Sequence, residues 1–240
     1  MADYVAPIAC DALANFTSST VTGGVGAHGI DTTHEQEGTG CYYVAISNAA
    51  GVAYSEKTLT SNIVNGSYWH LGFHLWHAKD YDFETPSALD NANYIRCIGI
   101  YDTVNDKRLG VQVEATPSAT FGRQWTIAST AGTYAVKAFD PGWARAAWKY
   151  IDIYGYVHNT AGWLQMWENG TKWCEVTGID TYPGNDWNRL VLGSSWEGAA
   201  ANEVCYVFDD FVVDDEASPA PPGTVRPWWY YRMLARRRSD

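Results

Sequence analysis

One short stretch, residues 148–157, combines the side chains best suited to chemistry. In an extended strand successive side chains point to opposite faces, so aromatic and acidic residues here fall on one face and aliphatic residues on the other. The mixed face carries Trp148, Tyr150, Asp152, Tyr154 and Tyr156. Aromatic rings can stack on the apolar faces of sugars while a carboxylate hydrogen-bonds the surrounding hydroxyls. This face is therefore a candidate for sugar binding, but packing against another protein chain or against the C-terminal tail is the favoured interpretation.

The neighbouring stretch 162–168 adds two indoles and an amide with the same alternation. If it pairs with 148–157, its polar and aromatic side chains join the same face. The candidate carbohydrate-binding residues are then Tyr150, Asp152, Tyr154, Trp163, Gln165 and Trp167.

Two other groups could in principle hold a metal ion. His70 and His74 share a strand face with Trp76, but nothing in the sequence shows a third ligand converging on them, so we expect ordinary polar-face histidines. Three acidic residues near the last and first predicted strands, Asp209, Asp210 and Asp11, supply the oxygen ligands that Ca²⁺ prefers. Solvated carboxylates at strand ends are the favoured interpretation. A structural calcium is the alternative, and no other cofactor is expected.

The elements that must position these residues are predicted to be strands. The chain of 240 residues holds 12 Trp, 16 Tyr and 22 Gly but only 3 Met, a bias typical of pleated strands joined by tight turns. Alternating segments separated by turn residues predict the strands 3–9, 41–47, 67–77, 94–101, 108–115, 122–128, 133–139, 147–158, 162–168, 171–177, 189–194 and 203–214. The intervening segments, including TGGVGAHG at 22–29, are interpreted as turns. Asn169-Gly170 predicts a type I′ hairpin.

These predictions give an all-β fold, a two-sheet antiparallel jelly-roll β-sandwich with an extended C-terminal arm. The sandwich is predicted to occupy residues 1–216, followed by a Pro-rich linker at 217–225 and a basic aromatic arm at 226–240. Aromatic residues and arginine are typical anchors of protein interfaces. The candidate interface residues are Trp228, Trp229, Tyr230, Tyr231, Arg232, Met233, Leu234, Arg236, Arg237 and Arg238.

Charge and hydropathy exclude several classes of function. The net charge is −11 and the arm is basic, so the rest of the chain carries −15, which disfavours nucleic-acid binding. No apolar run is long enough to span a membrane, and the first residues lack the pattern of a secretory signal. The five cysteines, an odd number without CxxC spacing, are expected to be buried thiols, with one disulfide between adjacent strands as the alternative.

The second half resembles the concanavalin-A-like lectin/glucanase superfamily, in particular its laminin-G-like branch. The resemblance rests on the order of four stretches: WKYIDIYGYV (148–157), GWLQMWENGTKW (162–173), VTGIDTYPGNDWNRLVLGSS (176–195) and YVFDDFVVDD (206–215). It covers 146–215 well and 40–140 only by strand pattern. It implies the β-sandwich and a choice among glycan binders, spacer modules and hydrolases.

The resemblance also allows a test for catalysis. Glucanases of this superfamily carry an E-x-D-x-x-E-like strand, with nucleophile and acid/base about 5.5 Å apart on one face. Here only Asp152 stands in the corresponding strand, between Tyr150 and Tyr154. The Arg-rich and Gln-x-His strands of alginate-lyase-like relatives are not found either. We therefore expect a protein that is not an enzyme.

The favoured function is a non-catalytic structural or decoration protein of a bacteriophage virion. It would assemble in the host cytoplasm without a signal peptide. The C-terminal arm would bind its own subunits or a capsid or tail protein, and the outward-facing sandwich would contact cell-surface glycans. The alternatives are a carbohydrate-binding module of a bacterial protein and, less favoured, a polysaccharide-active glycoside hydrolase or lyase.

Overall fold

The chain is almost entirely β-structure. The computed structural model describes residues 3–8, 10, 12–22, 26–33, 39–46, 52–77, 94–104, 107–114, 124–129, 132–138, 148–182, 184–195 and 204–215. Within these ranges it forms fifteen strands and one 3₁₀ helix, η1 (Leu13–Asn15). The predicted linker and C-terminal arm lie outside the described residues. The described part contains no helix that is long and apolar enough to cross a membrane.

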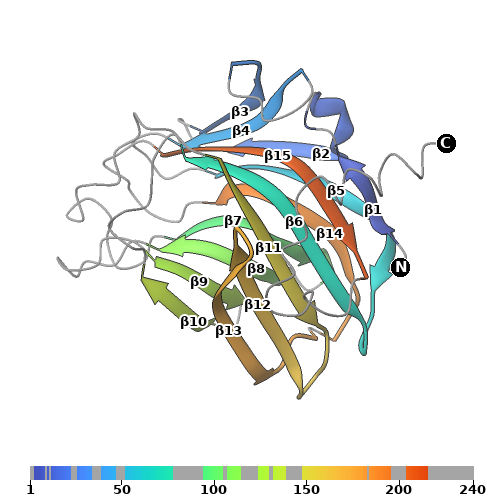
Figure 1. The fold of residues 1–240 in the computed structure, drawn as a ribbon. Helices are drawn as coiled ribbons and strands as arrows, with labels where there is room; N and C mark the ends of the chain where they lie inside the picture. Colours follow the sequence, from blue (N-terminus) through green and yellow to red (C-terminus); the bar gives the residue numbers. More distant parts are fainter. Residues whose placement is uncertain are drawn as a thin grey trace.

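Two antiparallel sheets pack face to face (Figure 1). The eight-stranded sheet has the order β13-β12-β11-β6-β15-β4-β3, and β1 also pairs with β15. Its strands are β1 (Asp3–Ile8), β3 (Gly26–Asp31), β4 (Cys41–Ile46), β6 (Tyr68–His77), β11 (Trp148–Tyr156), β12 (Gly162–Glu168), β13 (Thr171–Ile179) and β15 (Val204–Asp214).

The seven-stranded sheet has the order β10-β9-β8-β7-β14-β5-β2. Its strands are β2 (Ser18–Thr22), β5 (Val52–Ile63), β7 (Tyr94–Asp102), β8 (Lys107–Glu114), β9 (Gln124–Ser129), β10 (Gly132–Ala138) and β14 (Trp187–Ser195). The prediction of an all-β antiparallel sandwich is confirmed.

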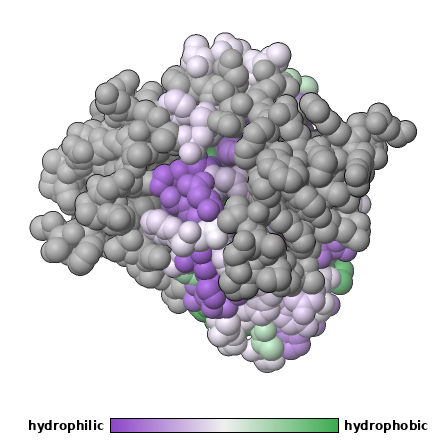
Figure 2. Space-filling view, viewed as in Figure 1, coloured by the Kyte–Doolittle hydropathy of each residue, from purple (hydrophilic) through white to green (hydrophobic). Residues whose placement is uncertain are grey.

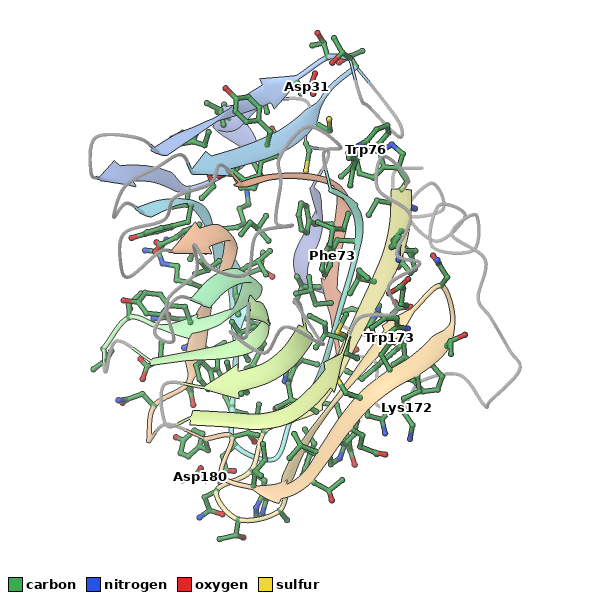
Figure 3. The ribbon with its side chains drawn as sticks, turned by 90° about the vertical axis from the view of Figure 1, so that its left-hand side faces the viewer. Asp31, Phe73, Trp76, Lys172, Trp173 and Asp180 are labelled. Carbon is green, nitrogen blue, oxygen red and sulfur yellow. The ribbon has the colours of Figure 1, made fainter. Side chains whose placement is uncertain are left out.

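The core fills the space between the sheets, and strict alternation in the central strands builds it. In β6, Trp69, Leu71, Phe73 and Leu75 are all buried in one hydrophobic cluster. Figure 3 shows Phe73 between the two sheets, and Lys172 on the outer side of β13. Because side chains alternate, the residues between these apolar positions must point away from the core. This places the even-numbered side chains of β6 on the outer side of its sheet.

Three strands were not predicted. Residues 22–29 were interpreted as a turn, but β3 begins at Gly26 and pairs with β4, and β2 ends at Thr22. A Cβ at Gly29 would lie 2.7 Å from the ring of Tyr43, so glycine lets that ring lie against the edge strand. The third strand, β5, is long, but residues 55–58 in its middle are polar on both faces. Alternation was therefore a weak signal there.

The hairpin between β12 and β13 is confirmed. Asn169 and Gly170 have φ values of 48° and 76°, the two positive angles of a type I′ turn. The Asn169 backbone N–H donates to the Tyr150 carbonyl, and the Tyr150 N–H donates to the Asn169 side chain. The turn is thus fixed to the start of β11, which holds β12 beside it.

A second glycine determines how side chains pack on the core side of β11. Gly155 pairs with Trp69 on β6, whose indole is completely buried. A Cβ at Gly155 would lie 2.3 Å from the indole nitrogen, closer than any real contact. Glycine at this position is therefore required for the large indole to lie flat against β11.

We expect Gly155→Ala to destabilise the fold by about 2 kcal/mol or more, because the added methyl group overpacks the core. Urea unfolding checks this. The exposed Ser61→Ala on β5 is the control and should change stability by no more than about 0.5 kcal/mol. Equal stability of the two variants would contradict this account of the packing.

Candidate functional site

The candidate site lies on the outer face of the eight-stranded sheet, which we define as the face turned away from the seven-stranded sheet. Its centre is made by β6, β11 and β15, which lie side by side. Figure 2 shows part of this face, with hydrophilic residues exposed between the parts that are drawn in grey. On these strands His70, Asp152 and Asp214 are buried even though they point away from the hydrophobic core.

The centre of the outer face is a charged group that we name the His70 cluster: His70, Asp152, Tyr154 and Asp214. The imidazole Nε2 lies 2.8 Å from Asp152 Oδ1, and Nδ1 lies 3.3 Å from Asp214 Oδ1. The Tyr154 ring stacks on the imidazole, with centroids 4.4 Å apart. The two carboxylates come from the strands on either side of β6, so three strands meet at one side chain.

The two carboxylates keep His70 charged. Burial alone would lower the pKa of this fully buried imidazole, but the contacts with Asp152 and Asp214 outweigh burial and raise its pKa to about 10. At neutral pH His70 is therefore an imidazolium, and Nε2–H donates to Asp152. Strongly shifted groups of this kind are enriched at functional sites, although structural ion pairs produce them too.

A first aromatic group lies at one end of β6 and β11. Trp76 and Trp148 meet edge to face with centroids 5.4 Å apart. His74 lies 5.0 Å from the Tyr150 ring, and its register partner on β15 is the buried Asp209. The described part of this end thus combines half-buried rings with a histidine and an aspartate that lie opposite each other in the strand register.

A second aromatic group lies at the other end of the same two strands. The Tyr68 and Tyr156 rings have centroids 4.7 Å apart, and Trp163 on β12 lies 6.2 Å from Tyr68. Tyr68 is 38% exposed. The group offers aromatic surface to a partner.

A hydrogen-bond relay orients the side chains of β12. Trp167 Nε1–H donates to Gln165 at 3.2 Å, and the Gln165 amide donates to Glu175 at 2.6 Å. Lys172 donates to the other oxygen of Glu175 at 2.7 Å. The hydrogen bonds from Lys172 and Gln165 lower the pKa of Glu175, so this carboxylate stays ionised. The relay fixes the Trp167 indole beside Asp152, its register partner.

The structure brings the sequence-predicted residues onto one face. Asp152 pairs with Trp167, Tyr154 with Gln165 and Tyr156 with Trp163. They are less exposed than expected for a sugar platform: Asp152 and Tyr154 are buried, and the residues of β12 are half-buried. Whether they bind a sugar stays a prediction.

Sequence reasoning missed the centre of the site. His70 and His74 were expected to be ordinary polar-face histidines. Instead, His70 is fully buried between two carboxylates. His74 is also almost completely buried. Asp214 was not singled out as a partner of either. The available signal was the strict alternation of two histidines with apolar residues in the predicted strand 67–77, which already placed both on the face opposite the core.

No calcium site is visible in the described part of the chain. Asp209 is buried beside β6, while Asp11 and the side chain of Asp210 lie outside what the structure describes. No group of three or more His, Cys, Asp or Glu side chains in the described ranges is placed to hold a metal ion. Of the cysteines, Cys10, Cys41 and Cys174 are buried, and the Cys41 thiol donates to the Asp31 carbonyl.

Comparison with known proteins identifies the fold. No family model and no curated protein matches the sequence. Among solved structures, an endo-β-1,4-glucuronan lyase from the fungus Trichoderma reesei matches at 12% identity with a TM-score of 0.55, over 87% of this chain and 94% of the lyase. The alginate lyase Aly36B matches at 11% identity with a TM-score of 0.56, over 89% of this chain and 98% of that one. At such identities the likeness shows the fold alone.

A binding domain also shares the fold. That of botulinum neurotoxin serotype G matches at 13% identity with a TM-score of 0.53, over 92% of this chain and 47% of the toxin chain. These structures agree with a jelly-roll sandwich. The laminin-G-like branch and the bacteriophage origin stay predictions.

The expectation that the chain is not an enzyme is contradicted by these comparisons and was wrong. Structures that match over most of both chains are named as polysaccharide lyases. The missing glucanase triad on one strand therefore does not mark this sandwich as non-catalytic.

We expect His70→Gln to flatten the pH dependence of stability. The pKa of His70 is raised from 6.5 to about 10, so the folded state keeps a proton that the unfolded state releases. The stabilisation is complete below pH 6.5 and is lost as the pH rises to about 10. Over this range the free energy of unfolding falls by at most about 1.4 kcal/mol per pH unit. Urea unfolding across this range measures it.

The control is His158→Gln. This loop imidazole accepts hydrogen bonds from the backbone N–H groups of Thr160 and Ala161 and is not part of the His70 cluster. Replacing His158 should leave the pH dependence of the free energy of unfolding as steep as it is in the wild-type protein. The same slope in His70→Gln and wild type would show that His70 is not charged in the folded protein.

Proposed function

We propose that this chain is a polysaccharide-active enzyme that binds a glycan along β6 and β11 on the outer face. The observation that supports this proposal is the arrangement of one buried charged cluster between two aromatic groups. From Trp148 to Tyr156 a strand rises by eight steps of roughly 3.3 Å, about 26 Å in all. A stretch of several sugar rings fits this length.

The aromatic groups would supply most of the binding energy. Pyranose rings have apolar C–H faces and hydroxyl edges, so flat rings such as those of Tyr68, Tyr156 and Trp163 suit them. The rings contact one another before any ligand arrives. Little side-chain entropy is then lost on binding, which favours affinity.

The His70 cluster would supply the acid–base groups. His70 is fully buried, so we assign it a positioning role toward Asp152 and Tyr154. Asp152 retains some exposure and stands between the two aromatic groups. We propose Asp152 as the group that exchanges a proton with the bound glycan, since acid–base catalysis needs a titratable side chain held at a fixed position.

The placement on a virion and the interface role of the arm remain part of the proposal rather than of the described structure. In this proposal a glycan-active domain lies on the virion surface and the arm attaches it there. The basic aromatic residues 226–240 keep their predicted role as the attachment segment.

We expect Trp163→Ala to weaken glycan binding about fivefold, because one stacking ring contributes on the order of 1 kcal/mol. Affinity electrophoresis in gels containing polysaccharides would measure the change. Tyr54→Ala on β5 is the matched control, since it removes a half-buried ring from the opposite sheet. Equal losses in the two variants would argue against this binding face.

We expect Asp152→Asn to reduce product release by about 100-fold or more, the usual contribution of a general acid or base. Release of reducing ends from a panel of polysaccharides is the measurement, with binding followed in parallel. Asp186→Asn, a carboxylate before β14, is the control and should keep full activity. A wild-type rate in Asp152→Asn would remove Asp152 from the chemistry.

A further inference from the structure

We propose that the glycan bound on the outer face is uncharged, a β-linked hexose polymer rather than a polyuronate. This inference rests on the proposed function and specifies its substrate class. It departs from the substrates named for the lyases that share the fold. The argument depends on where the charges of the outer face lie and on what each charge contacts.

Among the described side chains of β6, β11, β12, β13 and β15, outer-face carboxylates outnumber permanent cations. On β11, β15 and β13 the described outer-face carboxylates are Asp152, Asp209, Asp214 and Glu175. The described basic side chains on these strands' outer face are His70, His74 and Lys172. A polyuronate carries one negative charge per sugar, so each bound ring would bring a further carboxylate toward this acidic surface.

Each of these basic side chains already lies beside a carboxylate. His70 contacts two of them and has no exposed surface. His74 lies opposite Asp209 in the register of β6 and β15. None of the three basic groups is therefore a spare cation for a substrate carboxylate.

Lys172 shows the same arrangement at the edge of the site. It lies 2.7 Å from Glu175, which also accepts a hydrogen bond from Gln165. The charge of Lys172 is thus neutralised within the relay that orients Trp167. A uronate reaching this edge would compete with Glu175 for the ammonium group.

The aromatic groups fit the uncharged alternative. A β-linked hexose with equatorial hydroxyls has flat C–H faces on both sides, and two such groups stand at the ends of the charged centre. Asp152, the carboxylate of the centre that keeps some exposed surface, can accept hydrogen bonds from sugar hydroxyls, which are donors. A neutral sugar can therefore hydrogen-bond a carboxylate of this face, whereas a uronate is repelled by the same carboxylate.

The substrate class also determines the reaction. β-Elimination removes the C5 proton of a uronate, which is acidified by the neighbouring carboxylate, and a neutral hexose lacks that carboxylate. Cleavage of a neutral glycan would instead be hydrolysis. Water gives its hydroxyl group to C1 as the C1–O bond breaks, its other proton passes to the leaving oxygen, and both new chain ends are saturated.

The test compares glycans that differ only at C6. We would titrate hexamers of β-1,4-glucose, β-1,3-glucose and β-1,4-mannose, and the same hexamers oxidised at C6 to carboxylates, using calorimetry at low salt, where repulsion is least screened. In the pair that binds best, the neutral member should bind about tenfold more tightly, which corresponds to roughly 1.4 kcal/mol.

A variant tests the electrostatic cause. Glu175→Gln leaves Lys172 without its carboxylate partner, so the preference for the neutral hexamer should narrow about threefold, as expected for an exposed ion pair worth under about 1 kcal/mol. Glu56→Gln on β5 changes the net charge equally on the other sheet and should leave the preference intact.

Equal or tighter binding of the oxidised hexamers by the wild-type protein would overturn this inference while leaving the proposed glycan site standing. Absence of binding to all six hexamers would contradict the proposed function itself, and this inference with it. Unsaturated products from an oxidised polymer would also overturn it, because they identify elimination rather than hydrolysis.

Discussion

A protonated histidine held between two carboxylates on the outer side of a sheet constrains the rest of this structure. Burying a charge costs several kcal/mol unless it is paired, so His70 requires both Asp152 and Asp214. These partners belong to β11 and β15, which flank β6. A shift of one residue in either strand would turn a carboxylate toward the core and leave the imidazolium unpaired. The cluster therefore fixes the register of three central strands.

The same register arranges the candidate site. Asp152 stands opposite Gly72, which has no side chain, so the carboxylate can lean across β6 toward His70 on the diagonal. On the core side the matching constraint is Gly155, which accommodates the Trp69 indole. With the strands held from both sides, the aromatic groups at their two ends keep a fixed separation. A rigid spacing of this kind suits a polymer with a regular repeat.

Sequence alone predicted the sandwich and the face of β11 and β12, because both depend on local patterns: alternation, and the positive φ angles that Asn169-Gly170 supplies. Where alternation was weak, as in the polar middle of β5, the strand was missed. In the His70 cluster, His70 contacts side chains that lie 82 residues away or more along the chain. Only the pairing of β6 with β11 and β15 brings them together, and a single sequence does not show which strands pair. The mistaken expectation about catalysis has the same origin, since carboxylates were sought on one strand whereas the structure gathers them from two.

The likeness to polysaccharide lyases and the acidic character of the outer face are compatible once fold and site are treated separately. A jelly-roll sandwich supplies a broad sheet face and fixed strand spacing, and these suit any extended glycan. A few outward side chains determine whether the face suits a charged or a neutral glycan. The core does not constrain these side chains. Here the buried imidazolium is neutralised by its own partners, so the cluster adds rigidity without offering a cation to a ligand. Two sandwiches of this fold can therefore differ in whether they suit acidic or neutral polymers, according to whether a basic side chain on this face is left available or is already paired.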